Sequence, residues 1–248
     1  MWQFIKSLIQ KIMAFIGKFI YPSPPVGGGA FSPTDVAGLT VWLKADAITG
    51  LSDADPVTTW VDSSGNGNDA TQATASKKPI YKTSIINGKP IVRFDGTDDY
   101  VRTGAFTATA TAKTIFCVFN SDVDIWTYIS DGQSHNRGCF LTEPGKLTYH
   151  AGGGQISRTT SAHVGAFVYA TIVDNGASSS VNHNGGTPTT GTVNSATYTA
   201  ATVGTGGAEG TDEPFFNGDV AEWLLYDGAL SAGDISSVEG YLADKYAL

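Results

Sequence analysis

Short apolar segments alternate with glycine-containing turns from about residue 33 onward, at intervals of roughly 8–12 residues. The turns include Asn87-Gly88, Asp95-Gly96 and Asn217-Gly218, which adopt positive backbone φ angles at little steric cost. This spacing is typical of antiparallel strands rather than of parallel βαβ units. The sequence therefore predicts an all-β fold, a two-sheet antiparallel β-sandwich. We expect its strands at 39–45, 58–61, 91–94, 114–119, 126–130, 139–142, 146–150, 167–174, 179–182, 201–203 and 220–226.

The composition agrees with a folded, turn-rich β protein. Of 248 residues, 41% are hydrophobic and only 15% are charged, and 30 are glycine. That hydrophobic share is enough to bury a sizeable core. The formal net charge of −8 repels a polyanion, so we expect no nucleic-acid binding.

The end of the chain carries the helix signal of the β-rich region. Ser231 is a suitable N-cap, and Asp234 follows three residues later as in a capping box. Ile235, Val238 and Leu242 then recur on one helical face. We expect a short C-terminal helix that closes one edge or end of the sandwich.

Residues 1–21 have a different pattern, in which a wide apolar face opposes a cationic stripe. Pro22 ends the pattern, because proline has no amide donor. The sequence predicts an amphipathic anchoring helix at 1–21, a Pro/Gly linker at 22–32 and a globular domain at 33–248. The residues expected to anchor or oligomerise the helix are Trp2, Ile5, Leu8, Ile9, Ile12, Phe15, Ile16 and Phe19.

Several roles are open for this helix. Lys6, Lys11 and Lys18 interrupt the apolar run, which disfavours both a signal peptide and a transmembrane helix. The cationic stripe fits a helix lying on a membrane surface. The approximate heptad spacing of the apolar residues fits docking to another protein or self-association equally well. We therefore expect a homo-oligomer, for example a trimer, and leave membrane contact open.

Four ordered motifs lie in the globular region: 41–46 (VWLKAD), 60–70 (WVDSSGNGNDA), 87–101 (NGKPIVRFDGTDDYV) and 216–227 (FNGDVAEWLLYD). Together they resemble the concanavalin A-like, laminin-G-like jelly-roll family, as found in fibre, spike and decoration proteins of bacteriophage virions. The resemblance covers nearly all of residues 33–248. It implies a jelly-roll fold, and it is weak evidence of function because this fold carries lectins, adhesins, glycosidases and virion proteins.

Metal binding is the first functional question that the resemblance raises, because related domains often hold calcium on loop Asp and Asn oxygens. Asp95, Asp98 and Asp99 lie in a suitable loop. Calcium prefers six to eight oxygen ligands, so these carboxylates make only part of a site. The alternative is that they shape the turn after Phe94, and both interpretations stay open.

Catalytic motifs are scarce. A glycosidase needs two opposed carboxylates, and the nearest candidates, Asp219 and Glu222, are expected on opposite faces of one strand. The four histidines lack zinc-site spacing and are expected at the surface. We therefore expect a protein that is not an enzyme.

Aromatic residues offer two roles. Trp126 and Tyr128 alternate in a predicted strand and are candidates for an exposed sugar-binding platform. Four others lie at alternating apolar positions and are expected in the core: Trp42, Trp60, Phe94 and Trp223.

The layout of anchor, tether and head favours a structural protein on a virion surface. In that interpretation residues 1–20 bind other virion proteins and the lectin-like head binds host-surface glycans. One alternative is an adhesin held at the bacterial cell surface or secreted. A second alternative is a glycosidase that acts on polysaccharide.

Overall fold

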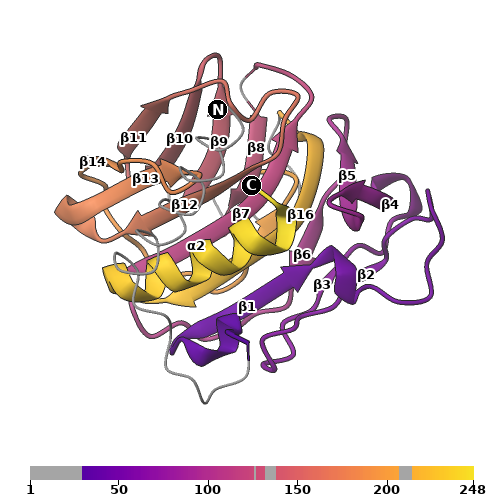
Figure 1. The fold of residues 1–248 in the computed structure, drawn as a ribbon, viewed down its shortest axis with the longest axis horizontal. Helices are drawn as coiled ribbons and strands as arrows, with labels where there is room; N and C mark the ends of the chain where they lie inside the picture. The colour runs from indigo at the N-terminus through magenta and orange to yellow at the C-terminus, as the bar shows by residue number, and fades with distance from the viewer. Residues whose placement is uncertain (1–29, 126, 132–137, 207–213) are drawn as a thin grey trace, which may run out of the picture. The chain divides into compact units, whose positions relative to one another are not determined.

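The computed structural model describes residues 30–125, 127–131, 138–206 and 214–248. These residues form antiparallel sheets and one α-helix, α2 (Ala232–Tyr246) (Figure 1). Sheet A has the strand order β14-β13-β12-β7-β16-β5-β4, and β1 also pairs with β16. Its strands are β1 (Leu39–Lys44), β4 (Ile80–Ile86), β5 (Lys89–Asp95), β7 (Lys113–Ser121), β12 (Val168–Asp174), β13 (Ser179–His183), β14 (Thr189–Gly191) and β16 (Asn217–Asp227).

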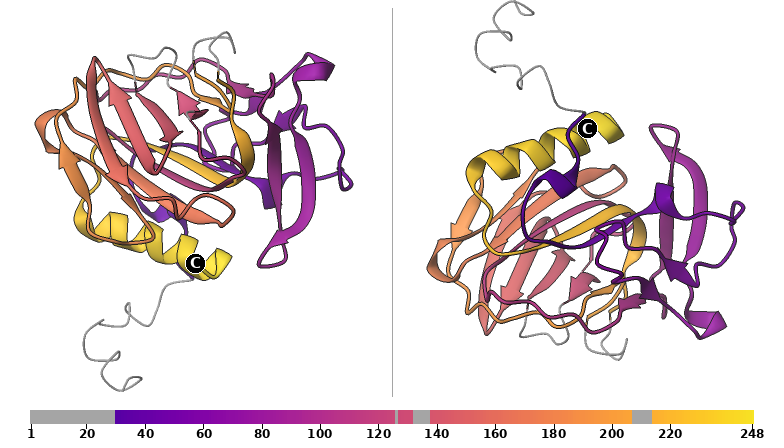
Figure 2. Two further views of the ribbon diagram at one scale, coloured as in Figure 1. Left: turned by 90° about the horizontal axis from the view of Figure 1, so that it is seen from above. Right: turned by 90° about the horizontal axis from the view of Figure 1, so that it is seen from below.

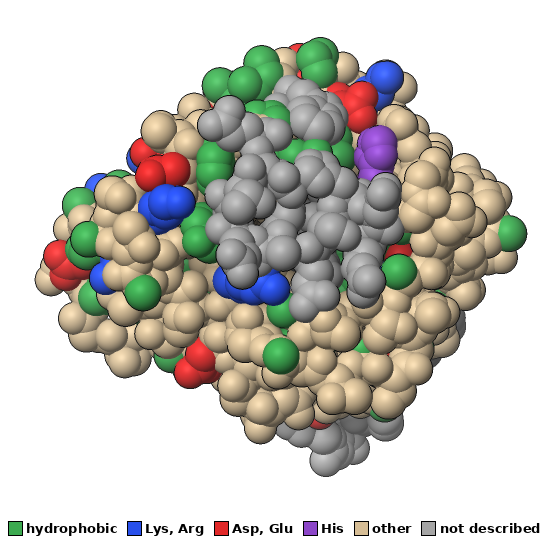
Figure 3. All heavy atoms as spheres, turned by 180° about the vertical axis from the view of Figure 1, so that it is seen from behind, with side chains coloured by type: hydrophobic (Ala, Val, Ile, Leu, Met, Phe, Trp, Pro, Cys, Tyr) green, Lys and Arg blue, Asp and Glu red, His purple; other side chains and the backbone are tan. Residues whose placement is uncertain are grey.

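Sheet B has the order β11-β10-β9-β8-β15-β6-β3-β2. Its strands are β2 (Thr59–Trp60), β3 (Ala70–Thr71), β6 (Val101–Thr103), β8 (Thr127–Asp131), β9 (Cys139–Glu143), β10 (Lys146–Ala151), β11 (Gly154–Thr159) and β15 (Thr202–Val203). Figure 2 shows sheet A between α2 and sheet B. Figure 3 shows the side opposite α2, where the visible charged side chains lie in small separate groups.

One hydrophobic core joins the two sheets. It contains Phe119 and Trp223 from sheet A together with Phe140 and Leu147 from sheet B, all fully buried. Strand alternation produces this core, since every second side chain of a strand faces the partner sheet. Trp60, Phe94 and Trp223 lie in it, as predicted from the sequence.

Trp42 is also buried, but it lies outside that core. Its 6% exposed side chain packs edge-on against Tyr241 of α2, with ring centroids 6.1 Å apart. Its register partner on β16 is Leu224, whereas the core residue Trp223 pairs with Leu43. Trp42 therefore belongs to the outer face of sheet A, which α2 covers.

A buried polar network holds α2 on this outer face. The fully buried Glu222 carboxylate accepts hydrogen bonds from Trp42 Nε1 at 2.5 Å, Lys245 Nζ at 2.7 Å and the Tyr246 hydroxyl at 2.8 Å. Lys245 also bonds Asp46 Oδ1 at 3.0 Å. The network joins β1, β16 and α2, so the last helical turn is fixed by charge as well as by apolar packing.

Tyrosines make the folded state sensitive to alkali. Burial, and then the charge of Glu222, raises the pKa of Tyr226, Tyr241 and Tyr246, and burial raises that of Tyr149 as well. A folded-state pKa above the unfolded value near 10 keeps the proton bound in the folded state while the unfolded state releases it. The contribution of these tyrosines to the free energy of unfolding is therefore complete below about pH 10, and it is lost as the pH rises further. Urea unfolding at pH 8, 10 and 11 is expected to show a steep fall only above pH 10; an unchanged midpoint at pH 11 would contradict the burial of these hydroxyls.

The strand predictions hold along the chain, with boundaries one to three residues longer or shorter. The short or edge strands β3, β4, β6, β11 and β14 were missed. The C-terminal helix is confirmed, and Ser231 Oγ accepts a hydrogen bond from Asp234 N at 3.2 Å. The anchoring helix predicted at 1–21, with Trp2, Ile5, Leu8, Ile9, Ile12, Phe15, Ile16 and Phe19, lies outside the described residues. Within the described part of the chain, no helix is long and apolar enough to cross a membrane.

Candidate functional site

A β-bulge in β16 corrects the expectation that Asp219 and Glu222 face opposite ways. The register to β7 shifts between Val220 and Glu222, so that Asp219 pairs with Asn120 and Glu222 pairs with Val118. These partners are two residues apart on β7, which places both carboxylates on the outer face of sheet A. The extra residue in the bulge cancels the odd spacing on which the sequence argument depended.

Sharing a face does not make the two carboxylates a catalytic pair. Glu222 is held in the network beneath α2. Asp219, whose side chain is 2% exposed, takes a two-pronged hydrogen bond from Arg93, with Nε at 2.7 Å from Oδ1 and Nη2 at 2.9 Å from Oδ2. Each carboxylate is therefore already bonded by a cation.

Arg93, fixed by Asp219, lines a hollow that we call the Arg93 pocket. Its volume is about 290 Å³. Arg93 keeps 38% of its side-chain surface exposed, so the guanidinium presents charge to the hollow while Asp219 fixes its plane. The lining residues are Ser76, Lys78, Ile80, Arg93, Phe94, Asp95, Asp99, Asp122 and Asn217.

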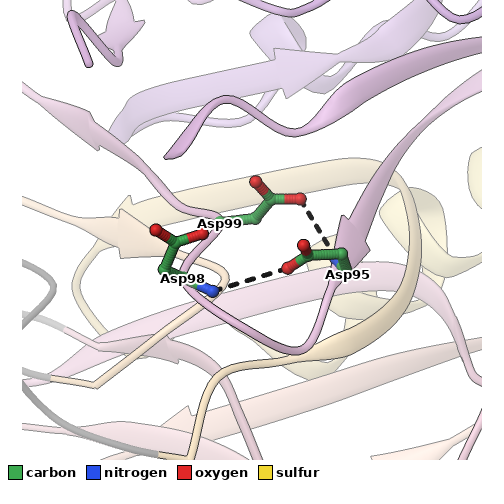
Figure 4. A group of neighbouring side chains, drawn as sticks. All are labelled: Asp95, Asp98 and Asp99. Carbon is green, nitrogen blue, oxygen red and sulfur yellow. Dashed lines mark hydrogen bonds between the residues drawn. The ribbon is translucent and has the colours of Figure 1, made fainter. Parts of the chain in front are cut away.

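Two of the three predicted calcium residues, Asp95 and Asp99, line this pocket, and Asp98 lies beside them. Asp95, Asp98 and Asp99 each offer an oxygen within 4.8 Å of the others. Figure 4 shows two of these carboxylates bonded to the backbone of their own loop. Asp95 Oδ1 accepts from Thr97 N at 2.8 Å, and Asp99 Oδ2 accepts from Asp95 N at 3.0 Å. These bonds support the turn-shaping interpretation.

The same carboxylates also fit a divalent cation chemically. Burial, and then the charges of Asp95 and Asp98, raises the pKa of Asp99 to about 6. A bound cation would relieve this repulsion. Asp95 and Asp99 each have a second oxygen besides the one used in the turn, and Asp98 enters the turn through its backbone N. Asp95, Asp98 and Asp99 would hold calcium together with water or ligand hydroxyls, and calcium binding stays a prediction.

Calcium binding has a direct thermal readout. A ligand that binds only the folded state stabilises it by RT ln(1 + [L]/Kd), about 2.7 kcal/mol at 100 times Kd. For a domain of this size that is a rise in melting temperature of roughly 5–10 °C. We expect millimolar CaCl₂ to produce this rise in the full-length protein at pH 7.5, and Asp98→Asn to abolish it. The exposed Asp244→Asn on α2 is the control. The same shift in D98N as in the wild type would place calcium elsewhere.

Tyr128, one of the two residues of the predicted aromatic platform, is buried in this structure. Tyr128 is only 2% exposed, and a side-chain atom built on Gly206 would lie 2.9 Å from its ring. Trp126 lies outside the described residues. A ligand site at Trp126 and Tyr128 stays a prediction, although the burial of Tyr128 removes the exposure on which the prediction depended.

The histidines correct a smaller expectation. His163 is fully buried rather than at the surface, and burial lowers its pKa to about 4. Its ring packs 5.9 Å from that of Phe119. His183 accepts a hydrogen bond from Arg158 Nε at 2.7 Å. Among the described residues, neither His163 nor His183 belongs to a group of three or more side chains that could hold a metal ion.

Sequence reasoning missed the cationic half of the pocket. Arg93 and Asp219 are charged residues in strands that contribute to the core, and each is next to core residues such as Phe94 and Val220. Two such positions of opposite sign indicate a cross-strand ion pair on the outer face. The two charges are visible in the sequence, but they indicate an ion pair only once β5 is known to pair with β16. Arg93 and Asp219 are 126 residues apart, so the sequence alone does not show that pairing.

No protein-family model and no curated protein matches the sequence. Solved structures match its fold. One is the binding domain of Paraclostridial Mosquitocidal Protein 1, with TM-score 0.59 and 12% identity over 85% of this chain and 53% of that chain. Another is the botulinum neurotoxin serotype D ligand binding domain in complex with N-acetylneuraminic acid, with TM-score 0.58 and 11% identity over 85% and 53%.

A glycoside hydrolase shares the fold as well. The GH54 α-L-arabinofuranosidase soaked with a cyclic sulfate inhibitor has TM-score 0.58 and 15% identity, over 77% of this chain and 51% of that chain. The chain thus spans about half the length of each of these proteins. At such identities the likeness concerns the fold alone.

Proposed function

We propose that residues 33–248 are a concanavalin A-like jelly-roll domain that binds glycans without hydrolysing them, and that the Arg93 pocket is the binding site. The observation that carries the proposal is the pocket itself. It combines a fixed guanidinium, carboxylates and the Asn217 amide in one hollow on a rigid sheet. Sugar hydroxyls require this mixture of donors and acceptors, and an acidic sugar also requires a cation.

The fold comparisons support the glycan class. One similar domain, that of botulinum neurotoxin serotype D, was solved with N-acetylneuraminic acid. Arg93, together with Lys78, would bind the carboxylate of such a sugar, and Asp122 would accept from its hydroxyls. Calcium on Asp95, Asp98 and Asp99 would add a second means of holding hydroxyl oxygens.

Two features favour binding over hydrolysis. Asp219 and Glu222, the candidate acid–base pair, are each bonded by a cation, and Glu222 is fully buried beneath α2. Hydrolysis with retention or inversion needs two carboxylates that reach the same glycosidic bond. The likeness to an arabinofuranosidase is one of fold and assigns no reaction to these residues.

The test is a glycan array probed with the full-length protein, with and without calcium. We expect retention on glycans that end in N-acetylneuraminic acid, loss of signal after sialidase treatment, and no released sugar after prolonged incubation. Retention on no glycan would contradict the proposal. Release of reducing sugar would instead support the glycosidase alternative.

The virion assignment is the finer part of the proposal. We propose that residues 1–20 join the head to other virion proteins, and that the protein is an oligomeric spike, fibre or decoration protein. It rests on the amphipathic pattern and on the motif resemblance. Deleting residues 1–20 is expected to leave a soluble protein that no longer joins the particle. Unimpaired assembly would contradict docking, and binding of the full-length protein to anionic liposomes would favour the cell-surface adhesin.

A further inference from the structure

A second hollow lies at the other end of β16 from the Arg93 pocket. We call it the Asn66 pocket, and its volume is about 450 Å³. The Arg93 pocket includes Asn217, the first residue of β16, whereas the Asn66 pocket includes Asp227, the last. Its walls come from the start of β1, from the loop at 62–69 and from the irregular segment at 104–112.

The two amide side chains of the loop are fixed in orientation. Asn66 Nδ2 donates to the carbonyl oxygens of Leu39 and Thr40 at 2.8 and 3.1 Å, and Asn68 Nδ2 donates to Thr40 O at 2.8 Å. A carbonyl accepts only from the nitrogen of an amide, so these bonds identify the other atom of each side chain as Oδ1. Among the hydrogen bonds of the described residues, none has either Oδ1 as its acceptor. Two oriented acceptors therefore belong to residues that line the hollow.

The loop that carries these amides is itself held by hydrogen bonds to Asp62. Asp62, which is buried, accepts hydrogen bonds through Oδ2 from Asn68 N at 2.9 Å and from the Ser64 hydroxyl at 2.7 Å. Its Oδ1 accepts from Trp42 N at 2.8 Å, which ties the loop to β1. The amides thus project from a framework that does not have to be ordered when a ligand binds.

The opposite wall is irregular in backbone but firmly tied. Asp227 accepts from Thr109 N at 2.7 Å and Ala110 N at 3.0 Å, and Phe106 N donates to Thr199 O at 2.8 Å. Phe106 packs partly on the hydrophobic core, and the next residue, Thr107, is exposed. This wall adds an apolar ring surface and a hydroxyl to the two amide acceptors. Both walls of the hollow are therefore held in place by hydrogen bonds.

We infer that the Asn66 pocket binds an uncharged saccharide, as a second sugar site distinct from the Arg93 pocket. Oriented acceptors beside a partly exposed ring fit the hydroxyls and apolar face of a sugar. None of the lining residues is a cation, and the single charged one, Asp227, is an anion. An acidic sugar would be repelled by the Asp227 carboxylate, and no lining cation would pair with the sugar's own charge. The pocket therefore selects neutral ligands. The inference rests on the proposed sugar-binding function and extends it to a second ligand class.

The test uses ligand-observed NMR on the full-length protein with methyl α-D-mannopyranoside, methyl β-D-galactopyranoside and N-acetylneuraminic acid as probes. Thr107→Arg places a long side chain over the hollow without touching the amide bonds, and Asn66→Ala removes one acceptor. S76L/D122L lines the Arg93 pocket with apolar groups. S236L/D244L makes the same two changes at exposed positions of α2 and is the control. The melting temperature of each variant reports any loss of folding.

We expect at least one neutral glycoside to bind, with an affinity at least tenfold lower in T107R and N66A and unchanged in S76L/D122L and the control. N-acetylneuraminic acid should not displace it. A neutral glycoside lost in S76L/D122L but kept in T107R would overturn the second site while leaving the proposed function intact. If N-acetylneuraminic acid is the only probe that binds, the second site is likewise overturned and the proposed function stands. If none of the three probes binds, both the second site and the proposed function are contradicted.

Discussion

Replacing Asp174 by alanine is expected to lower the free energy of unfolding by about 3–5 kcal/mol, the usual cost of breaking a buried ion pair from one side. Asp174 is fully buried and accepts from Lys113 Nζ at 2.6 Å and from the Tyr149 hydroxyl at 2.7 Å. It also bonds the Ser195 hydroxyl. Lys113 has a side chain that is 3% exposed, so its ammonium would be left in the interior without its carboxylate. Urea unfolding of the full-length protein measures the change.

Two comparisons separate the effect of charge from that of packing. In K113M/D174L both charges are gone, and the cost should be clearly smaller than in Asp174→Ala, because apolar replacement of a buried pair is often neutral. Asp53→Ala breaks the ion pair with Lys82 in which the Asp53 side chain is 48% exposed, and it should change stability little. Equal losses in D174A and D53A would show that Asp174 is not buried as the structure has it.

Glu222→Ala is expected to have a similar cost, again about 3–5 kcal/mol, for a related reason. The substitution leaves the Trp42 indole and the Tyr246 hydroxyl without their carboxylate beneath α2. Lys245 keeps its bond to Asp46, which limits the loss at the helix end. Because the network fastens α2 to the sheet, we also expect faster proteolysis of the C-terminal helix. Urea unfolding followed by tryptophan fluorescence, with limited proteolysis in parallel, measures both effects.

Glu222→Gln is the matched variant. It keeps an acceptor for the Trp42 indole but removes the charge that Lys245 faces at 2.7 Å. Its free energy of unfolding should therefore lie between that of the wild type and that of Glu222→Ala. If Glu222→Gln and Glu222→Ala cost the same, hydrogen bonding to Trp42 contributes nothing. If neither costs anything, the network does not hold α2.

The fold was largely predictable because its signals are local. The Asn-Gly and Asp-Gly turns place residues such as Asn87 at positive φ, as the sequence predicted. The Ser231 cap likewise depends on residues three apart. Short or edge strands were missed because their pairing partners, rather than their own sequences, hold them. β3, for example, has two residues and is held by β2 and β6.

The candidate site was only partly predictable. Asp95, Asp98 and Asp99 were recognised because they are close in sequence; the structure groups their carboxylates and places Asp95 and Asp99 in the lining of the Arg93 pocket. Ser76 and Asp122 come from distant segments that meet only after the strands pair. The bulge after Val220 reverses the side on which every later residue of β16 lies, and no residue type in that strand announces it. The errors about Asp219 and Glu222 follow from that one extra residue.

The measurement that tests the central claim most directly is a titration of full-length protein with N-acetylneuraminic acid, comparing the wild type with S76L/D122L and with the S236L/D244L control. If the Arg93 pocket is the glycan site, the wild type and the control bind equally, and S76L/D122L binds at least tenfold more weakly with an unchanged melting temperature. Equal binding by all three proteins, or no binding by the wild type, would contradict the assignment of this pocket.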